Sequence, residues 1–441
     1  MLLLMVIYPF PSLYPNRIDM FTDILKKRSI DLPYGVTYTT GESSSLSPFI
    51  CVREDTSKFT SFGFKFEYLK GNYGFVIAPI FKRGDTLVFP DKEWKNLVAA
   101  DFDYSGIYIK NKYFYGWIGR NHQNFGPSPL NNPILSTEAP PFSNIMYSFK
   151  GKKFDINLFY SSLDRYNGPQ YDPSITISDT VSIQRHLLIH RLEISPSKWL
   201  GIGFTEMSLF GNKYGEILPS FFNPFRVYYA DQFNERENSN VFWNFDWVIL
   251  LKNNLLYGNF LIDDFQYESD PYNEPDHIGI NIGFFSNICS DNFLLIEYNR
   301  FSRWVYGHYL VWQRYIYSKW YIGMNPAANF ENLYVIFYMI NDKFRLSPYL
   351  NIQRSGETNP YTPWPVNYNK PPDSLNSFPD NNFLDGTIQK KLSGGAEIKI
   401  SRWVNIEVSL GGIYFTNYNH KNGVNKFFPL IHLQFSKKFN L

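Results

Sequence analysis

The side chains best suited to acid–base or nucleophilic chemistry are scattered along this chain of 441 residues. The histidines are His122, His186, His190, His277, His308, His420 and His432. On a strand, His186 and His190 would lie on one side but about 13 Å apart, too far to share a metal ion. The motifs GxSxG, HExxH and the P-loop are absent. We therefore predict no enzymatic activity, no metal and no cofactor, with a Ser–His hydrolase assembled in space as the open alternative.

Acidic side chains form a more suggestive pattern. Asp263 and Asp264 follow the strand-like run 255–262 in LIDDFQYE, and Asp246 lies on the preceding run. On a barrel strand, one of two adjacent aspartates must face inward. They are either solvated charges at a rim or acceptors for sugar hydroxyls in a polar wall, where Tyr and Trp would stack on sugar faces.

A cation and an aromatic ring lie close together in YGWIGR, where Arg120 follows Trp117. This combination suits an acidic sugar. A structural role is the alternative for every residue of the predicted polysaccharide-binding set, which comprises Trp117, Arg120, Asp246, Asp263 and Asp264.

The elements that must hold these side chains are strands. Apolar and polar residues alternate at residues 62–68, 154–160, 278–284, 396–400 and 404–410. Alternation in runs of about 10 residues is typical of membrane barrel strands, apolar side out and polar side in. Soluble sandwiches alternate too. Strand-like units that continue almost to the last residue, and polar residues at inward positions, favour the barrel.

Composition supports this choice. Phe, Tyr and Trp make up 19% of the residues, and they favour strands and membrane interfaces. Tyr and Trp recur near predicted strand ends, at residues 113–117 and 312–321. The net charge of +2 indicates no nucleic-acid partner. We predict an all-β protein, an antiparallel transmembrane β-barrel of about 16 to 18 strands in contact with outer-membrane lipid.

The amino-terminal segment differs from the rest. Residues 2–7 resemble the apolar core of a signal peptide, and residues 16–28 (NRIDMFTDILKKR) predict a short helix with an apolar stripe. We expect export, with residues 1–30 as a signal remnant and a periplasmic or plug helix. Residues 31–441 would then form the barrel.

The stretch 119–143, GRNHQNFGPSPLNNPILSTEAPPFS, interrupts the alternation with five prolines and four asparagines. Proline removes a backbone donor and fixes φ, so this stretch cannot be a central strand. Its amide side chains can satisfy a chain folded back on itself. We expect it to fold inward and constrict the barrel.

This stretch also resembles the Wzi family of outer-membrane capsule-assembly proteins. Members show a Gly-Arg-like pair, a Trp-Gly-Pro-like turn, and then a Ser, small residues and Pro-Phe. The matching residues here are Gly119, Arg120, Phe125, Gly126, Pro127, Ser136, Ala139, Pro140, Pro141 and Phe142. Phe125 stands where Trp is expected and Glu138 where Asn is frequent. FTEMSLFG (204–211), the stretch 221–240 and LYGNFLIDDFQ (256–266) are similar to the family as well.

The resemblance implies a barrel of about 18 strands in the bacterial outer membrane that helps to retain or organise surface polysaccharide as a lectin. We expect a monomer with a plugged lumen. A porin or passive transporter is the alternative function, and a barrel enzyme acting on lipid or glycan is a third.

Overall fold

The computed structural model describes residues 42–440 except 86–88, 91, 96–97, 173–178, 235–237, 267–269, 290–291, 342, 380–382 and 402. The predicted helix at residues 16–28 and the boundary at residue 30 lie outside the described residues. Those two predictions stay predictions.

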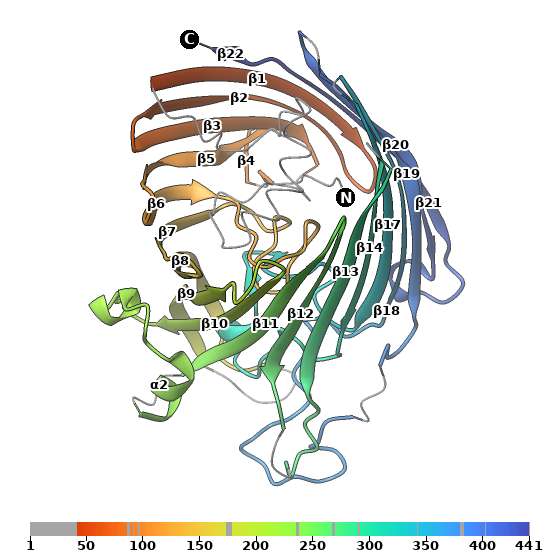
Figure 1. The fold of residues 1–441 in the computed structure, drawn as a ribbon. Helices are drawn as coiled ribbons and strands as arrows, with labels where there is room; N and C mark the ends of the chain where they lie inside the picture. Colours follow the sequence, from red (N-terminus) through yellow and green to blue (C-terminus); the bar gives the residue numbers. More distant parts are fainter. Residues whose placement is uncertain are drawn as a thin grey trace.

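Almost every element is a strand (Figure 1). The strands of the wall are β1 (Glu42–Glu54), β2 (Lys58–Lys70), β3 (Tyr73–Gly84), β5 (Val98–Lys110), β6 (Phe114–Asn121), β7 (Phe142–Lys150), β8 (Phe154–Pro169), β9 (Thr180–Ile194), β10 (Leu200–Asn212), β11 (Ser239–Leu251), β12 (Asn254–Asp264), β13 (His277–Cys289), β14 (Asn292–Phe301), β17 (Phe330–Ile340), β18 (Phe344–Ser355), β19 (Gln389–Ser401), β20 (Asn405–Thr416) and β21 (Lys426–Ser436). The short strands are β4 (Glu93–Lys95), β15 (Ile316–Tyr317), β16 (Trp320–Tyr321) and β22 (Phe439–Asn440).

The wall is a closed antiparallel barrel of 18 strands, as the sequence predicted. Each strand pairs with the next, and β1 closes the barrel by pairing with β21 from Phe49↔Ser436 to Glu54↔Ile431. The short β22 extends this seam along β1. Closure leaves no unpaired edge in the wall, which is the condition for strands to cross a bilayer.

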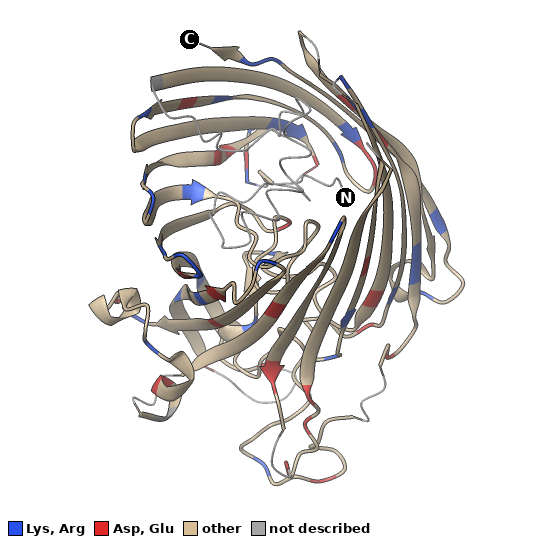
Figure 2. Ribbon diagram, viewed as in Figure 1, with Lys and Arg blue, Asp and Glu red and all other residues tan. Residues whose placement is uncertain are grey.

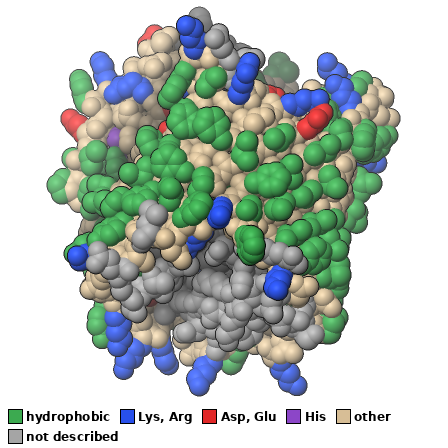
Figure 3. Space-filling view, turned by 90° about the horizontal axis from the view of Figure 1, so that it is seen from above, with side chains coloured by type: hydrophobic (Ala, Val, Ile, Leu, Met, Phe, Trp, Pro, Cys, Tyr) green, Lys and Arg blue, Asp and Glu red, His purple; other side chains and the backbone are tan. Residues whose placement is uncertain are grey.

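The period of two separates a lipid face from a lumen face. On β13, Ile282 is 46% exposed and its neighbour Asn281 is fully buried. On β20, Leu410 is 52% exposed and Ser409 is 2% exposed. Figure 3 shows one outer face, where hydrophobic side chains cover a broad band and Lys and Arg lie mostly along its two edges. The predicted apolar-out, polar-in alternation is confirmed at these positions.

The two ends of the barrel differ in their connections. At one end short turns join the strands, as at residues 111–113, 151–153 and 252–253. At the other end all the long connections emerge, including residues 213–238 and 356–388. In outer-membrane barrels the long loops are extracellular. We call this end the outer end.

Of the long connections that the structure describes without gaps, two fold into the lumen. The first insert (residues 122–141) links β6 to β7, and the second insert (residues 302–329) links β14 to β17 and contains η2 (Val311–Gln313), β15 and β16. They bind each other: Tyr306 Oη donates to Pro133 O at 2.6 Å, Tyr315 Oη donates to Ile134 O, and Ser136 N donates to Ile322 O at 3.1 Å. The first insert therefore folds inward, as its prolines and asparagines predicted.

The aromatic residues predicted to form interface belts lie mostly elsewhere. Tyr113 is exposed in a turn, but Tyr115 and Trp117 are buried in the cluster that the inserts form with the wall. Trp312 and Tyr315 are buried within the second insert. The interface interpretation is wrong for these four side chains. Tyr115 and Trp117 face the lumen from the wall strand β6, and Trp312 and Tyr315 belong to an insert that packs inside the barrel.

Residues 213–234, the outer flap, lie outside the wall beside β9 and β10 (Figure 1). The flap contains η1 (Pro219–Phe222) and α2 (Tyr228–Asn234), and its Phe221 and Tyr228 pack on Leu188 and Phe210 of the wall. Among the described residues, no helix is both long enough and apolar enough to span a bilayer.

Candidate functional site

A belt of amide side chains crosses the lumen wall. Register places Asp246, Asn259, Asn281, Asn299 and Asn332 side by side on β11, β12, β13, β14 and β17. Asn259 Nδ2 donates to Asn281 Oδ1 at 2.9 Å, and Asn281 Nδ2 donates to Asn299 Oδ1 at 2.6 Å. Asn299 Nδ2 donates to Asn332 Oδ1 at 2.9 Å. All five are buried. Because each Asn both donates and accepts, this amide belt forms a continuous chain of hydrogen bonds.

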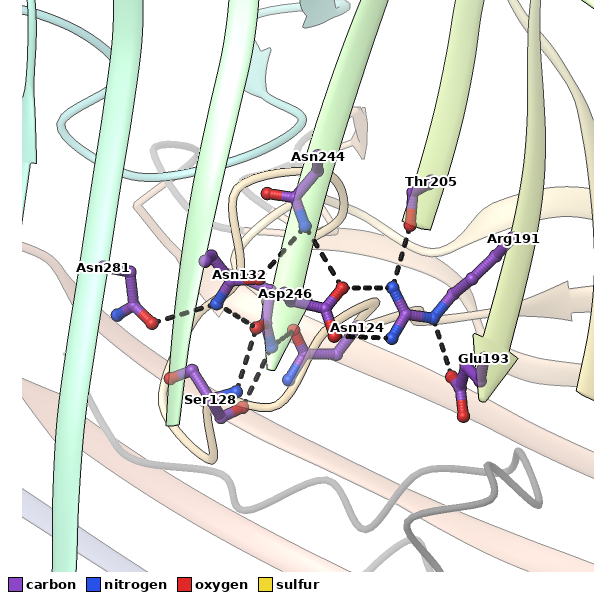
Figure 4. Close-up of polar contacts among 10 residues, drawn as sticks. Asn124, Ser128, Asn132, Arg191, Glu193, Thr205, Asn244, Asp246 and Asn281 are labelled. Carbon is purple, nitrogen blue, oxygen red and sulfur yellow. Dashed lines mark hydrogen bonds and ion pairs between the residues drawn. The ribbon is translucent and has the colours of Figure 1, made fainter. Parts of the chain in front are cut away.

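A buried ion pair ends the belt (Figure 4). Arg191 binds Asp246 with two nitrogens, Nη1 to Oδ2 at 2.5 Å and Nη2 to Oδ1 at 2.9 Å. The same guanidinium donates to Glu193 and Thr205. Gly203 lies between the two partners, and a Cβ there would stand 2.5 Å from both Arg191 Nη2 and Asp246 Oδ1. Glycine at this position makes the room that the pair needs.

The first insert is attached to the belt. Asn259 Nδ2 also donates to Asn132 Oδ1 at 3.3 Å, and Asn132 Nδ2 donates to Asn124 Oδ1 at 2.8 Å (Figure 4). Ser128 Oγ donates to the buried carboxylate of Glu297 on β14 at 2.5 Å. The insert is therefore held across the lumen by side chains of strands that lie far from it in sequence.

The second insert is held by Asp263, the first of the two adjacent aspartates that end β12. The register shifts between Ile262 and Asp264, and Asp263 Oδ2 accepts a bond from Tyr306 N at 2.6 Å. Asp264 is exposed at the outer end. The inference that one of the two faces inward is confirmed, and the inward residue anchors an insert.

The five predicted binding residues do not form one site. Trp117 is buried among the inserts, and both carboxylate oxygens of Asp246 accept bonds from Arg191. Arg120 is three positions from Trp117 and pairs with Asp101, Nη2 to Oδ2 at 3.0 Å, with its guanidinium 5.5 Å from the ring centroid of Phe89. Their roles in sugar binding stay predictions.

A cavity of about 350 Å³ opens among three long connections at the outer end. It is lined by Tyr171, Asp172, Tyr309, Trp364, Val366, Asn367, Tyr368 and Asn369. These residues come from the connections after β8, β14 and β18. We call it the rim cavity. None of the five predicted residues lines it.

Aromatic rings shape the rim cavity. Tyr171 and Tyr309 are stacked with centroids 6.3 Å apart, and Tyr368 lies edge-on to Tyr309 at 5.4 Å. Trp364 Nε1 donates to Tyr368 Oη at 3.3 Å. The connections are joined by Arg314 of the second insert, whose Nη2 binds Asp172 Oδ2 at 2.8 Å. None of these residues was predicted from the sequence, although aromatic residues inside long polar connections were the available signal.

The rim cavity offers flat apolar faces beside polar groups. Asp172, Asn367 and Asn369 contribute carboxylate and amide atoms. Burial raises the pKa of Tyr309, so its hydroxyl stays protonated and can donate a hydrogen bond. Aromatic faces with a few polar groups that set orientation are the usual lining of small-molecule sites. Stacking on a ring and hydrogen bonds to hydroxyls are what a sugar requires.

The barrel-enzyme alternative required a Ser or Asp within reach of a histidine. His122 meets the distance condition, since its Nε2 lies 2.8 Å from Asp103 Oδ1. Its Nδ1 lies 3.0 Å from Ala139 O of the first insert. Both ring nitrogens are therefore occupied in joining the insert to β5, and neither is left to activate a nucleophile.

A closed 18-stranded barrel with an apolar outer band and long loops at one end is a bacterial outer-membrane β-barrel. Comparison with solved structures agrees. Wzi of Escherichia coli, described as an outer-membrane carbohydrate-binding β-barrel involved in group 1 capsule assembly, aligns with a TM-score of 0.64 at 13% identity over 97% of this chain and 88% of Wzi. OccK3 of Pseudomonas aeruginosa aligns with a TM-score of 0.50 at 10% identity over 96% of this chain and 100% of its own.

OccD3 of Pseudomonas aeruginosa is similar to the same degree, with a TM-score of 0.50 at 11% identity over 94% of this chain and 97% of its own. No protein-family model and no curated protein matches the chain. At these identities the likeness concerns the fold, and a function must be argued from the residues.

Proposed function

We propose that this protein is a non-enzymatic lectin of the outer membrane that binds a surface polysaccharide at its outer end and takes part in capsule assembly or retention. The observation that carries the proposal is the rim cavity, whose rings and polar groups have the chemistry of a sugar site. The carbohydrate-binding barrel Wzi shares the fold, which is consistent with this proposal.

The rings of the cavity would take the apolar faces of a sugar. Partly exposed Tyr309 offers aromatic surface, and Trp364, which is 4% exposed, lines the cavity beside it. The side chains of Asp172 and Asn367 can exchange hydrogen bonds with hydroxyls. Partly exposed Tyr368 would close over the bound unit.

The two inserts and the amide belt would act as the rigid support. A site on loops is precise only where its loops are fixed by packing and hydrogen bonds. Here the second insert supplies Tyr309 and is itself anchored to Asp263 and to the first insert. Binding would then need little ordering of the rim, which reduces its entropic cost.

A glycan array probed with the purified barrel tests the proposal, followed by titration calorimetry on each hit. Replacing Trp364 or Tyr309 by Ala should weaken binding at least about tenfold, as expected for an aromatic residue at the centre of a site. Tyr214→Ala is the matched control, since Tyr214 is 76% exposed on the outer flap. Retention of no polysaccharide, or equal binding by all variants, would refute the lectin function.

A passive transporter is the second candidate, and one observation favours it. A second cavity of about 50 Å³ lies on the lumen side of β17–β21, where Arg345, Lys391 and Glu397 provide charges that a solute path could use. Conductance in planar bilayers separates the two functions. We expect small or no steady conductance, and a large ungated one would favour the transporter.

A further inference from the structure

Three potential metal ligands converge where β12 ends and β13 begins, at the base of the connection 265–276. One ligand atom each from Asp264, Glu274 and His277 lies within 4.8 Å of the others. Asp264 and His277 are direct partners in the ladder, brought into register by the shift that displaces Asp263. Figure 2 shows acidic residues at the tip of β12, where the long outer connections begin.

An unsatisfied nitrogen points into this group. The side chain of His277 is 3% exposed, and among the described residues its Nε2 has no hydrogen-bond partner. Glu274 Oε1 lies 3.8 Å from this nitrogen, too far for a hydrogen bond. The ring lies T-shaped to Trp364 with centroids 5.8 Å apart and tilted against Phe378 with centroids 6.4 Å apart. A buried imidazole nitrogen without a partner calls for an explanation, and an ion is one.

The carboxylate of Glu274 is fixed in place. Its backbone N donates to Asp270 Oδ2 at 2.7 Å, and its Oε2 accepts a bond from Tyr368 Oη at 2.8 Å. Gln266 N donates to Asp276 Oδ1 at 2.9 Å, which closes the base of the loop. Outer hydrogen bonds that orient a ligand are characteristic of built metal sites. They leave Oε1 as the oxygen nearest His277.

We propose that Asp264, Glu274 and His277 bind a divalent transition-metal cation of the Zn²⁺ class. One imidazole nitrogen with two carboxylate oxygens is a donor set for such metals, whereas Ca²⁺ and Mg²⁺ prefer oxygen alone. Three protein ligands leave a fourth position for water or another oxygen donor.

The cation has a consequence for the rim cavity, and only this consequence rests on the proposed function. Tyr368 lines the cavity and donates to Glu274, and Trp364 contacts both Tyr368 and His277. An ion that fixes Glu274 and His277 would fix this aromatic wall as well. Polysaccharide binding should therefore weaken when the metal is removed.

Titration calorimetry of the chelator-treated, full-length barrel in detergent with ZnCl₂ tests the site. The wild type should bind one equivalent, and His277→Gln and Glu274→Gln should each weaken binding at least about 100-fold. His420→Gln and Glu216→Gln are matched controls at the same end of the barrel that should bind as the wild type does. Zinc X-ray absorption should report nitrogen and oxygen neighbours only.

A wild type that binds no zinc, a His277→Gln protein that binds as tightly as the wild type, or loss of binding in His420→Gln would each overturn the proposal. Asp264→Asn keeps shape and removes one charge, so a folded Asp264→Asn barrel with weakened binding supports it even if His277→Gln misfolds. Zinc binding without any polysaccharide binding would refute the lectin function and leave the cation site intact.

Discussion

At the scale of single residues, two Arg–Asp pairs in this barrel differ mainly in burial. The side chains of Arg191 and Asp246 are 3% and 0% exposed, whereas those of Arg120 and Asp101 are 21% and 36% exposed. Removing one partner of a buried pair leaves a charge without compensation, while an exposed pair contributes little because water screens it. The same chemistry therefore has different consequences at the two places.

We predict that Asp246→Ala lowers the free energy of unfolding by about 3 to 5 kcal/mol. The loss should be at the lower end of that range, because Glu193 still accepts a bond from Arg191. Asp101→Ala, the exposed counterpart, should cost about 1 kcal/mol or less. Urea unfolding of barrels folded into lipid vesicles measures both. Equal losses in the two variants would contradict the role of burial.

His308 in the second insert gives stability a dependence on pH. Burial lowers the pKa of His308 to about 3, with nearby Arg314 and His277 adding to the effect. In the unfolded chain His308 binds a proton near pH 6.5, whereas in the folded barrel it stays neutral until the pH is near 3. The stability that depends on neutral His308 is therefore complete above pH 6.5 and is lost as the pH falls toward 3. The slope is at most about 1.4 kcal/mol per pH unit.

His308→Asn removes the titration and keeps an acceptor for the bond from Leu310 N. We predict that the urea midpoint falls less between pH 7 and about pH 4.5 in this variant than in the wild type. His420→Asn, at the outer end, is the control. An unchanged pH slope in His308→Asn would show that this imidazole is not kept neutral by burial.

At the scale of elements, the first insert is one of the two connections that fold into the lumen, and we expect it to restrict the path through the barrel. A barrel of 16 to 18 strands would otherwise leave an aqueous path. Asn121 and Phe142, at the two ends of the insert, are direct partners in the β6–β7 ladder, so a short turn can replace the residues between them.

Replacing residues 123–140 by a short Gly/Ser turn should give a folded barrel with a several-fold larger conductance in planar bilayers. Because the second insert loses its bonds to Pro133 and Ile134, polysaccharide binding at the rim should weaken as well. Shortening the outer loop 417–425 is the control and should leave conductance unchanged. A folded deletion variant with wild-type conductance would show that the insert does not restrict the path.

At the scale of the whole molecule, the sequence predicted the barrel because alternation is local: each strand displays its lipid and lumen faces at a period of two. The direction of the first insert was also predictable, since its prolines and asparagines act within the segment. The rim cavity was not predictable, because Tyr171, Tyr309 and Trp364 are separated by many strands and meet only when the barrel closes.

The same limit explains two features of the sites that spacing along the sequence could not show. Trp117 and Arg120 are neighbours in sequence, but a separation of three along a strand places their side chains on opposite faces. Asp264 and His277 are distant in sequence, and only the register shift in β12 makes them partners. Spacing identifies neighbours on one strand, whereas a site at a rim depends on pairing between strands.

The depth at which each strand position lies in the membrane can be tested with charged substitutions. Leu410 lies in the middle of β20 and is 52% exposed, and Ile109 lies beside the short turn at the end of β5 and is 48% exposed. If the apolar band contacts lipid, Leu410→Arg should lower the free energy of unfolding from phospholipid vesicles by about 2 to 4 kcal/mol. Ile109→Arg should lower it by only about 0 to 1 kcal/mol, because the cost of placing a cation in lipid falls from the midplane to the interface. Tryptophan fluorescence in urea titrations measures the difference. Similar costs at the two depths would show that this band does not face a bilayer centred on the strands.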